Sequence, residues 1–230
     1  MTENQAVQQK SVRRNRVAAA ACFAAALITV SVVGAQSASA DAAAHRAAAA
    51  RPAAVAAVAP GLGSARLVQS EDLLQKGLKP VGATVELTGR QALSACSGEE
   101  TMRDLTKGAA TGYASVNWTL DTDGMLTESA ASAPTGTSAA LWEKQLVALV
   151  QDCQDEPAGH WYYGTAHTLT TTGGTAHWYP AHNGDGTVSG GVAVLRSGNR
   201  VAIAELSGRP TAAPSQVEGL AAAALKRLSS

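Results

Sequence analysis

The chain contains 230 residues, of which 18 are basic and 18 acidic, so its formal net charge is zero. This balance gives no electrostatic attraction for nucleic acid or for an anionic membrane surface. The sequence contains no phosphate-binding loop, no dinucleotide-binding glycine pattern and no G-x-S-x-G elbow, so no cofactor is expected and enzymes that depend on those motifs are disfavoured.

Residues 1–40 have the three parts of a secretory signal peptide. Arg13, Arg14 and Arg16 precede an apolar run at 17–33, and small residues close the segment. We therefore expect cleavage between Ala40 and Asp41 and a secreted protein. Retention of 17–33 as a membrane anchor is the alternative, although this run is shorter than the ~20 apolar residues that span a bilayer. The arginine pair leaves general secretory and twin-arginine export both open.

Residues 41–63 are rich in alanine and are interrupted by Pro52 and Pro60. Alanine favours a helix, but this segment has too little apolar bulk to attach one to a core. We therefore expect a disordered linker at 41–63 and a folded domain at 64–230.

Signal cleavage also changes the number of cysteines. Cys22 lies in the apolar run and leaves with the signal, so Cys96 and Cys153 remain. An even pair of cysteines in an oxidising compartment predicts one disulfide. A redox-active pair is the alternative, but no Cys-x-x-Cys motif occurs.

Hydrophobic periodicity and capping residues predict the elements of the domain. Helices are expected at 70–76, at 99–107, at 138–153 and from 214 onward, and strands at 80–88, 113–120, 125–133, 188–195 and 200–206. Strands placed between two long amphipathic helices indicate an α+β domain. We expect an antiparallel sheet with both long helices packed on one face.

The helix at 138–153 shows the clearest periodicity. Its apolar residues recur at helical spacing and form one stripe: Ala139, Trp142, Leu146, Leu149, Val150 and Cys153. The thiol of Cys153 is therefore expected to point into the domain, where a bond to Cys96 would tie this helix to the segment before residue 99.

Residues 160–182 concentrate four of the five histidines and five of the eight aromatic residues that follow the signal. A metal site is one interpretation, since imidazole suits zinc and copper. However, His160 and His167 are an odd number of residues apart, as are His177 and His182, so neither pair shares one face of a strand. A site with two imidazoles lacks the third protein ligand that zinc needs, and we predict no metal.

The other interpretation of this segment is a hairpin that turns at 172–174. An even loop would place Trp161, Tyr163, His167 and Leu169 on the face of Trp178, Pro180 and His182, under the helices. The opposite face would then carry Tyr162, His177 and Tyr179 as a candidate ligand platform. The same rings could instead be cross-strand pairs that stabilise the sheet, and an odd loop would exchange the faces of the second strand.

Four features together resemble a known family: Cys96, the helix end ALVQDC at 148–153, the hairpin AVLRSGNRVAIAEL at 193–206 and the closing PSQVEGLAAAALKRL at 214–228. The pattern is similar to the extracellular sensor domain of actinobacterial PknH-type kinases, which also occurs alone in secreted proteins. The resemblance implies an antiparallel sheet, helices tethered by a disulfide and a groove for an unidentified ligand. Family members commonly carry a second disulfide, which this chain lacks.

Three functions follow from these features. The first is a secreted, non-enzymatic, sensor-like domain that binds a small ligand or an envelope component, with no strongly perturbed titratable group beside its groove. The second is a secreted hydrolase, which requires a serine or carboxylate within hydrogen-bonding reach of a histidine. The third is a structural envelope protein, favoured if the aromatic residues are wholly buried and no groove exists.

Overall fold

The computed structural model describes residues 62–208 and 214–230. The predicted signal peptide, its cleavage site at Ala40–Asp41 and most of the predicted linker lie outside the described residues. The two linker residues that are described are Leu62 and Gly63, and Leu62 is buried in the core. Within the described ranges, no helix is both long and apolar enough to cross a membrane.

The described elements in chain order are η1 (Ser64–Arg66), α1 (Ser70–Gln75), β1 (Pro80–Glu86), η2 (Ala95–Ser97), α2 (Met102–Leu105), β2 (Gly112–Leu120), β3 (Met125–Ser132), α3 (Gly136–Gln151), β4 (Tyr162–Tyr163), β5 (His167–Thr171), β6 (Gly174–His182), β7 (Val188–Ser197), β8 (Arg200–Ser207) and α4 (Ser215–Ser229). The two η elements are short 3₁₀ turns. The main departure from the predicted helices is α2, which is shorter than 99–107 and is capped by the hydroxyl of Thr101.

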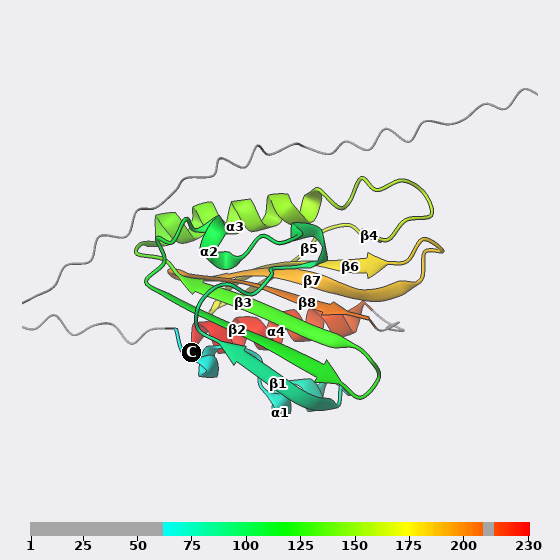
Figure 1. Cartoon of the computed structure of the whole chain (residues 1–230), viewed down its shortest axis with the longest axis horizontal. Coiled ribbons are helices and arrows are strands. Elements are labelled where there is room, and N and C mark those ends of the chain that lie inside the picture. Colours follow the sequence, from blue (N-terminus) through cyan, green and yellow to red (C-terminus); the bar gives the residue numbers. More distant parts are fainter. Residues whose placement is uncertain (1–61, 209–213) are drawn as a thin grey trace, which may run out of the picture. The chain divides into compact units, whose positions relative to one another are not determined.

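The strands form one eight-stranded antiparallel sheet in the order β1-β2-β3-β8-β7-β6-β4, and β5 also pairs with β6. The predicted α+β class and antiparallel sheet are confirmed. Hairpins join β2 to β3 and β7 to β8, and the β3–β8 pairing brings these two hairpins together in the middle of the sheet (Figure 1).

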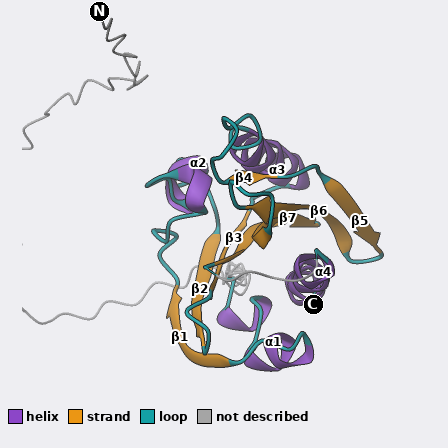
Figure 2. Cartoon of the chain, turned by 90° about the vertical axis from the view of Figure 1, so that its right-hand side faces the viewer, coloured by secondary structure: helices purple, strands orange, loops and turns teal. Residues whose placement is uncertain are grey.

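The two long helices pack on opposite faces of the sheet, so the prediction that they share one face was wrong. One core joins α4 to one face through Leu220, Ala193 and Leu195. The other joins α3 to the opposite face through Leu146 and Val194, and α2 lies on the same side (Figures 1 and 2). The physical reason is visible in β7 and β8, which are apolar at successive positions instead of alternating, as strands covered on both faces are.

The buried stripe of α3 agrees with the sequence pattern. Ala139, Trp142, Leu146 and Val150 are all buried against the sheet. The hydroxyl of Thr135 accepts a hydrogen bond from the Ser138 backbone N–H at 3.1 Å and so caps the first turn of the helix.

Residues 160–171 form two short strands, β4 and β5, on one edge of β6, not one long strand. His167 pairs with Trp178 through a hairpin with the expected even loop, but Tyr162 pairs with His182. The register therefore shifts by one residue between β4 and β5, and such a shift exchanges the faces of the side chains. The sequence analysis placed Tyr162 and His182 on opposite faces of the sheet, and this prediction was wrong because the two residues are cross-strand partners. Gly164 lies at the break, where a Cβ would be 2.8 Å from the His182 ring.

Candidate ligand pocket

The three residues proposed as a ligand platform do not share one face. Tyr162 stacks on the ring of His182 with centroids 5.1 Å apart, on the face opposite Tyr179. Tyr179 is buried between the sheet and α3, and only 1% of its surface is exposed. His177 is partly exposed beside Glu143 of α3. Ligand binding by Tyr162, His177 and Tyr179 stays a prediction from the sequence, and the pocket described below has other lining residues.

Among the described residues, His177 Nδ1 lies 3.4 Å from the Thr168 hydroxyl, but no serine or carboxylate takes the position that the hydrolase hypothesis requires. His177 and His160 each lie 3.9 Å from a carboxylate oxygen, of Glu143 and Glu156 respectively, which exceeds hydrogen-bond distance. No serine hydroxyl in these ranges is hydrogen-bonded to an imidazole, and His167 is stacked on Trp178. Residues 62–208 and 214–230 also contain no group of three ligands suited to a metal ion.

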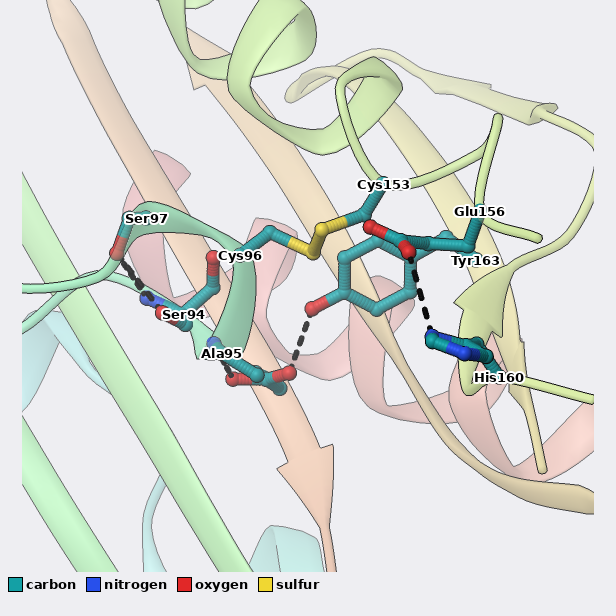
Figure 3. The surroundings of a disulfide bond; sticks show 9 residues. Ser94, Ala95, Cys96, Ser97, Cys153, Glu156, His160 and Tyr163 are labelled. Atoms are coloured by element: carbon teal, nitrogen blue, oxygen red, sulfur yellow. Dashed lines mark hydrogen bonds and ion pairs between the residues drawn. A yellow bond between two sulfur atoms is a disulfide. The ribbon is translucent and has the colours of Figure 1, made fainter. Parts of the chain in front are cut away.

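The disulfide between Cys96 and Cys153 is confirmed, with the two Cα atoms 6.0 Å apart. It joins η2 to the end of α3 on the α3 face of the sheet (Figure 3). The carbonyl of Cys153 also accepts a hydrogen bond from the backbone N–H of Tyr163 at 3.1 Å. One covalent bond and one backbone bond therefore bring η2, the end of α3 and β4 to the same place.

A buried carboxylate lies directly beneath this junction. Glu205 of β8 accepts a hydrogen bond from the Tyr163 hydroxyl at 2.5 Å and another from the Ala95 backbone N–H at 2.8 Å. Burial raises the pKa of Glu205, and the two hydrogen bonds only partly oppose this. Burial and the neighbouring Glu205 carboxylate raise the pKa of the Tyr163 hydroxyl as well. The expectation that no titratable group is strongly perturbed near the groove was wrong for Tyr163.

A half-open pocket of about 330 Å³ adjoins this junction. Its walls come from the η2 turn, the segment before β4, both ends of the β6–β7 connection and the end of β8. The lining residues are Ala95, Trp161, Asn183, Ser189, Leu206, Ser207 and Gly208. The volume is at the lower end of the ~300–1,000 Å³ that small-molecule pockets usually have.

Trp161 occupies a fixed position at this pocket. Its indole Nε1–H donates a hydrogen bond to the Ser189 hydroxyl at 3.2 Å, and its ring packs edge-on against Tyr163 with centroids 4.7 Å apart. Tyr163 in turn is held by Glu205. The pocket wall is thus connected through aromatic packing and hydrogen bonds to the disulfide-linked layer.

Among the pocket residues, the sequence pattern singled out only Trp161, as a member of the aromatic cluster. Ala95, Asn183, Ser189 and Ser207 carry no motif, and distant segments of the chain bring them together. One feature of the sequence that could have indicated the pocket is that Ala95 directly precedes Cys96. Another was Glu205, which stands on the same side of its strand as Val201 and Ile203 and is therefore an acid in a buried row.

Comparisons with known proteins give a structural likeness but no sequence match. No protein-family model matches the chain, and no curated protein matches its sequence. A solved structure to which the chain is similar is the extracellular domain of PknH from Mycobacterium tuberculosis, with 14% sequence identity and a TM-score of 0.49. The likeness covers 72% of this chain and 93% of that chain. The pocket and the function proposed for it rest on the residues described above and not on this likeness.

Proposed function

We propose that the chain is a secreted, non-enzymatic, sensor-like protein whose domain at 64–230 binds a small ligand in the Trp161 pocket. The observation that carries the proposal is the pocket itself, a concave site of about 330 Å³ that combines an aromatic ring with several polar groups. Sites of this composition, with mostly apolar walls and a few placed polar atoms, are typical of ligand binding.

Secretion is supported by two independent features. The N-terminal sequence has the pattern of a cleavable signal ending at Ala40, followed by an alanine-rich linker. The disulfide between Cys96 and Cys153 is a bond that persists in oxidising compartments. The sensor-like role comes from the resemblance of the cysteine positions, the final hairpin and the last helix to sensor domains of PknH type.

Native mass spectrometry of the protein recovered from culture medium tests this proposal. We expect a polypeptide that begins at Asp41 and a bound small molecule. The mass of the polypeptide should be lower than that of the dithiol form by two hydrogen atoms. A precursor-length mass would contradict the signal peptide, and two free thiols would contradict the disulfide.

A pocket-filling variant locates the ligand. Ser207→Trp places an indole in the pocket wall and should abolish the bound species. Thr170→Trp adds the same group to exposed β5, away from the pocket-lining residues, and should leave it bound. Retention of the ligand in folded Ser207→Trp, or binding of no small molecule by the unaltered protein, would overturn the pocket assignment.

A further inference from the structure

The lining of the Trp161 pocket carries no formally charged side chain among the described residues. Two of its residues, Ala95 and Trp161, supply apolar side-chain surface, and three others, Asn183, Ser189 and Ser207, supply neutral hydrogen-bonding groups. A charged ligand entering this pocket would lose water without gaining an opposite charge from the described lining residues, and that loss is costly.

Glu205 lies behind the pocket wall and limits the charge that a ligand can carry. It is bonded to the backbone N–H of Ala95, which itself lines the pocket. Anionic ligands are disfavoured by a carboxylate at this position. A cationic ligand would be attracted by the same charge but could not bond to it directly, because both carboxylate oxygens already accept hydrogen bonds, from the Tyr163 hydroxyl and the Ala95 N–H, and the side chain is buried.

The neutral polar groups retain hydrogen-bonding capacity. The Ser189 hydroxyl accepts the bond from Trp161 and still has its own proton to donate. Asn183 donates through Nδ2 to Thr187 at 3.0 Å. Within 62–208 and 214–230, neither Asn183 Oδ1 nor the Ser207 hydroxyl has a hydrogen-bond partner. An acyl chain would cover these groups without bonding to them, and burying them in that way is unfavourable.

From these constraints we infer that the pocket binds a neutral saccharide. A sugar ring presents C–H groups that pack on aromatic and aliphatic surface and hydroxyls that both donate and accept hydrogen bonds. The apolar surface of Trp161 and Ala95 and the polar atoms of Ser189, Ser207 and Asn183 match these two kinds of group. This inference rests on the proposed function, because it names the ligand class for the same pocket.

Three sugars that share one ring test the inference. Glucose is neutral, glucuronate is its anionic counterpart and glucosamine its cationic one. Binding is followed in the full chain by the ¹H–¹⁵N signals of the tryptophan indoles, of which Trp161→Phe identifies the pocket signal. We expect glucose or its neutral disaccharide cellobiose to shift the Trp161 signal at lower concentration than either charged sugar.

A second set of variants tests the role of the ring. Trp161→Ala should weaken neutral-sugar binding by about tenfold, or ~1.4 kcal/mol, since it removes an aromatic packing surface; calorimetric titration measures this loss because the variant lacks the indole signal. Thr170→Ala, which lies on exposed β5 outside the pocket lining, is the control and should bind normally.

The outcomes separate this inference from the proposed function. A stronger response to glucuronate or glucosamine, or a pocket ligand from the culture medium that is charged or is a lipid, would overturn the saccharide class and leave the pocket in place. No shift of the Trp161 signal with any compound, together with no co-purifying ligand, would overturn both.

Discussion

Two buried glutamates hold different positions in the sheet. Glu205 faces the α3 side and has a hydrogen-bond donor for each oxygen. Glu128 of β3 is completely buried on the α4 side. Its Oε2 accepts a hydrogen bond from the Val68 N–H at 2.6 Å, whereas its Oε1 has no partner among the described residues. Burial raises the pKa of Glu128 to about 8.

The raised pKa of Glu128 makes stability depend on pH. The unfolded chain loses the proton of this carboxyl near pH 4.5, whereas the folded protein holds it until about pH 8. The associated stability is fully present below pH 4.5 and is lost as the pH rises through the folded pKa, at up to about 1.4 kcal/mol per pH unit. Glu128→Gln cannot titrate, so its free energy of unfolding should exceed that of the unaltered protein by an amount that grows from pH 5 to pH 8.

Urea denaturation of both proteins across this pH range measures that difference. Subtracting the two curves removes the contribution of every other titrating group. A difference that stays constant with pH would mean that Glu128 ionises normally in the folded protein.

Tyr163 is the partner that Glu205 depends on most directly. Tyr163→Phe removes the hydroxyl and leaves a buried carboxylate oxygen without its donor, which should cost about 1–3 kcal/mol of stability. Tyr162→Phe removes a hydroxyl from the adjacent, partly exposed residue and is expected to change stability by less than about 0.5 kcal/mol. Thermal denaturation of the two variants side by side gives the comparison, and equal effects would contradict the assigned hydrogen bond.

At the scale of elements, the disulfide fastens two segments that have little regular structure. η2 is a single 3₁₀ turn, and the segment between α3 and β4 contains no helix or strand. Their geometry depends on the bond between Cys96 and Cys153 and on the hydrogen bonds around it. Because Ala95 lines the pocket, the same bond also holds one pocket wall in place.

Removal of this bond should therefore weaken both stability and ligand binding. The bridged residues are 57 apart in sequence, for which the chain-entropy model gives about 4 kcal/mol of stabilisation. We expect a loss approaching that value in Cys96→Ser/Cys153→Ser, measured by urea denaturation. Unaltered stability of the double variant would show that η2 and the end of α3 hold together without the bond.

At the scale of the whole molecule, one sheet separates two hydrophobic cores. Leu146 of α3 belongs to the core that contains the disulfide layer, and Leu220 of α4 belongs to the core beneath the other face. The two side chains share no packing neighbours across the backbone of the sheet. Their contributions to stability should therefore be nearly independent.

A double-mutant cycle tests this independence. Leu146→Ala and Leu220→Ala should each cost about 2–5 kcal/mol, because each leaves a cavity in a packed core. The double variant should lose the sum of the two within about 0.5 kcal/mol. A coupling energy well above that would indicate that the two helices contact one shared core. If the double variant does not fold, Leu146→Val and Leu220→Val give the same comparison with smaller losses.

The sequence by itself determined the local elements and the cross-link. The 3.6-residue stripe of α3, the alternation and turn residues of β2 and β3, and the hairpin of β7 and β8 are set by neighbouring residues, so their positions are readable from short windows. The pairing of Cys96 with Cys153 was predicted because the expected signal peptide would remove Cys22.

Tertiary structure alone decided which face each helix covers and where the pocket forms. The apolar runs in β7 and β8 allow burial on both sides, but only the packed chain places α3 on one side and α4 on the other. The break at Gly164 shifts the register by one residue and so separates Tyr162 from Tyr179. The pocket unites residues from 95 to 208 along the chain, and contacts between such distant segments leave no periodic trace in the sequence.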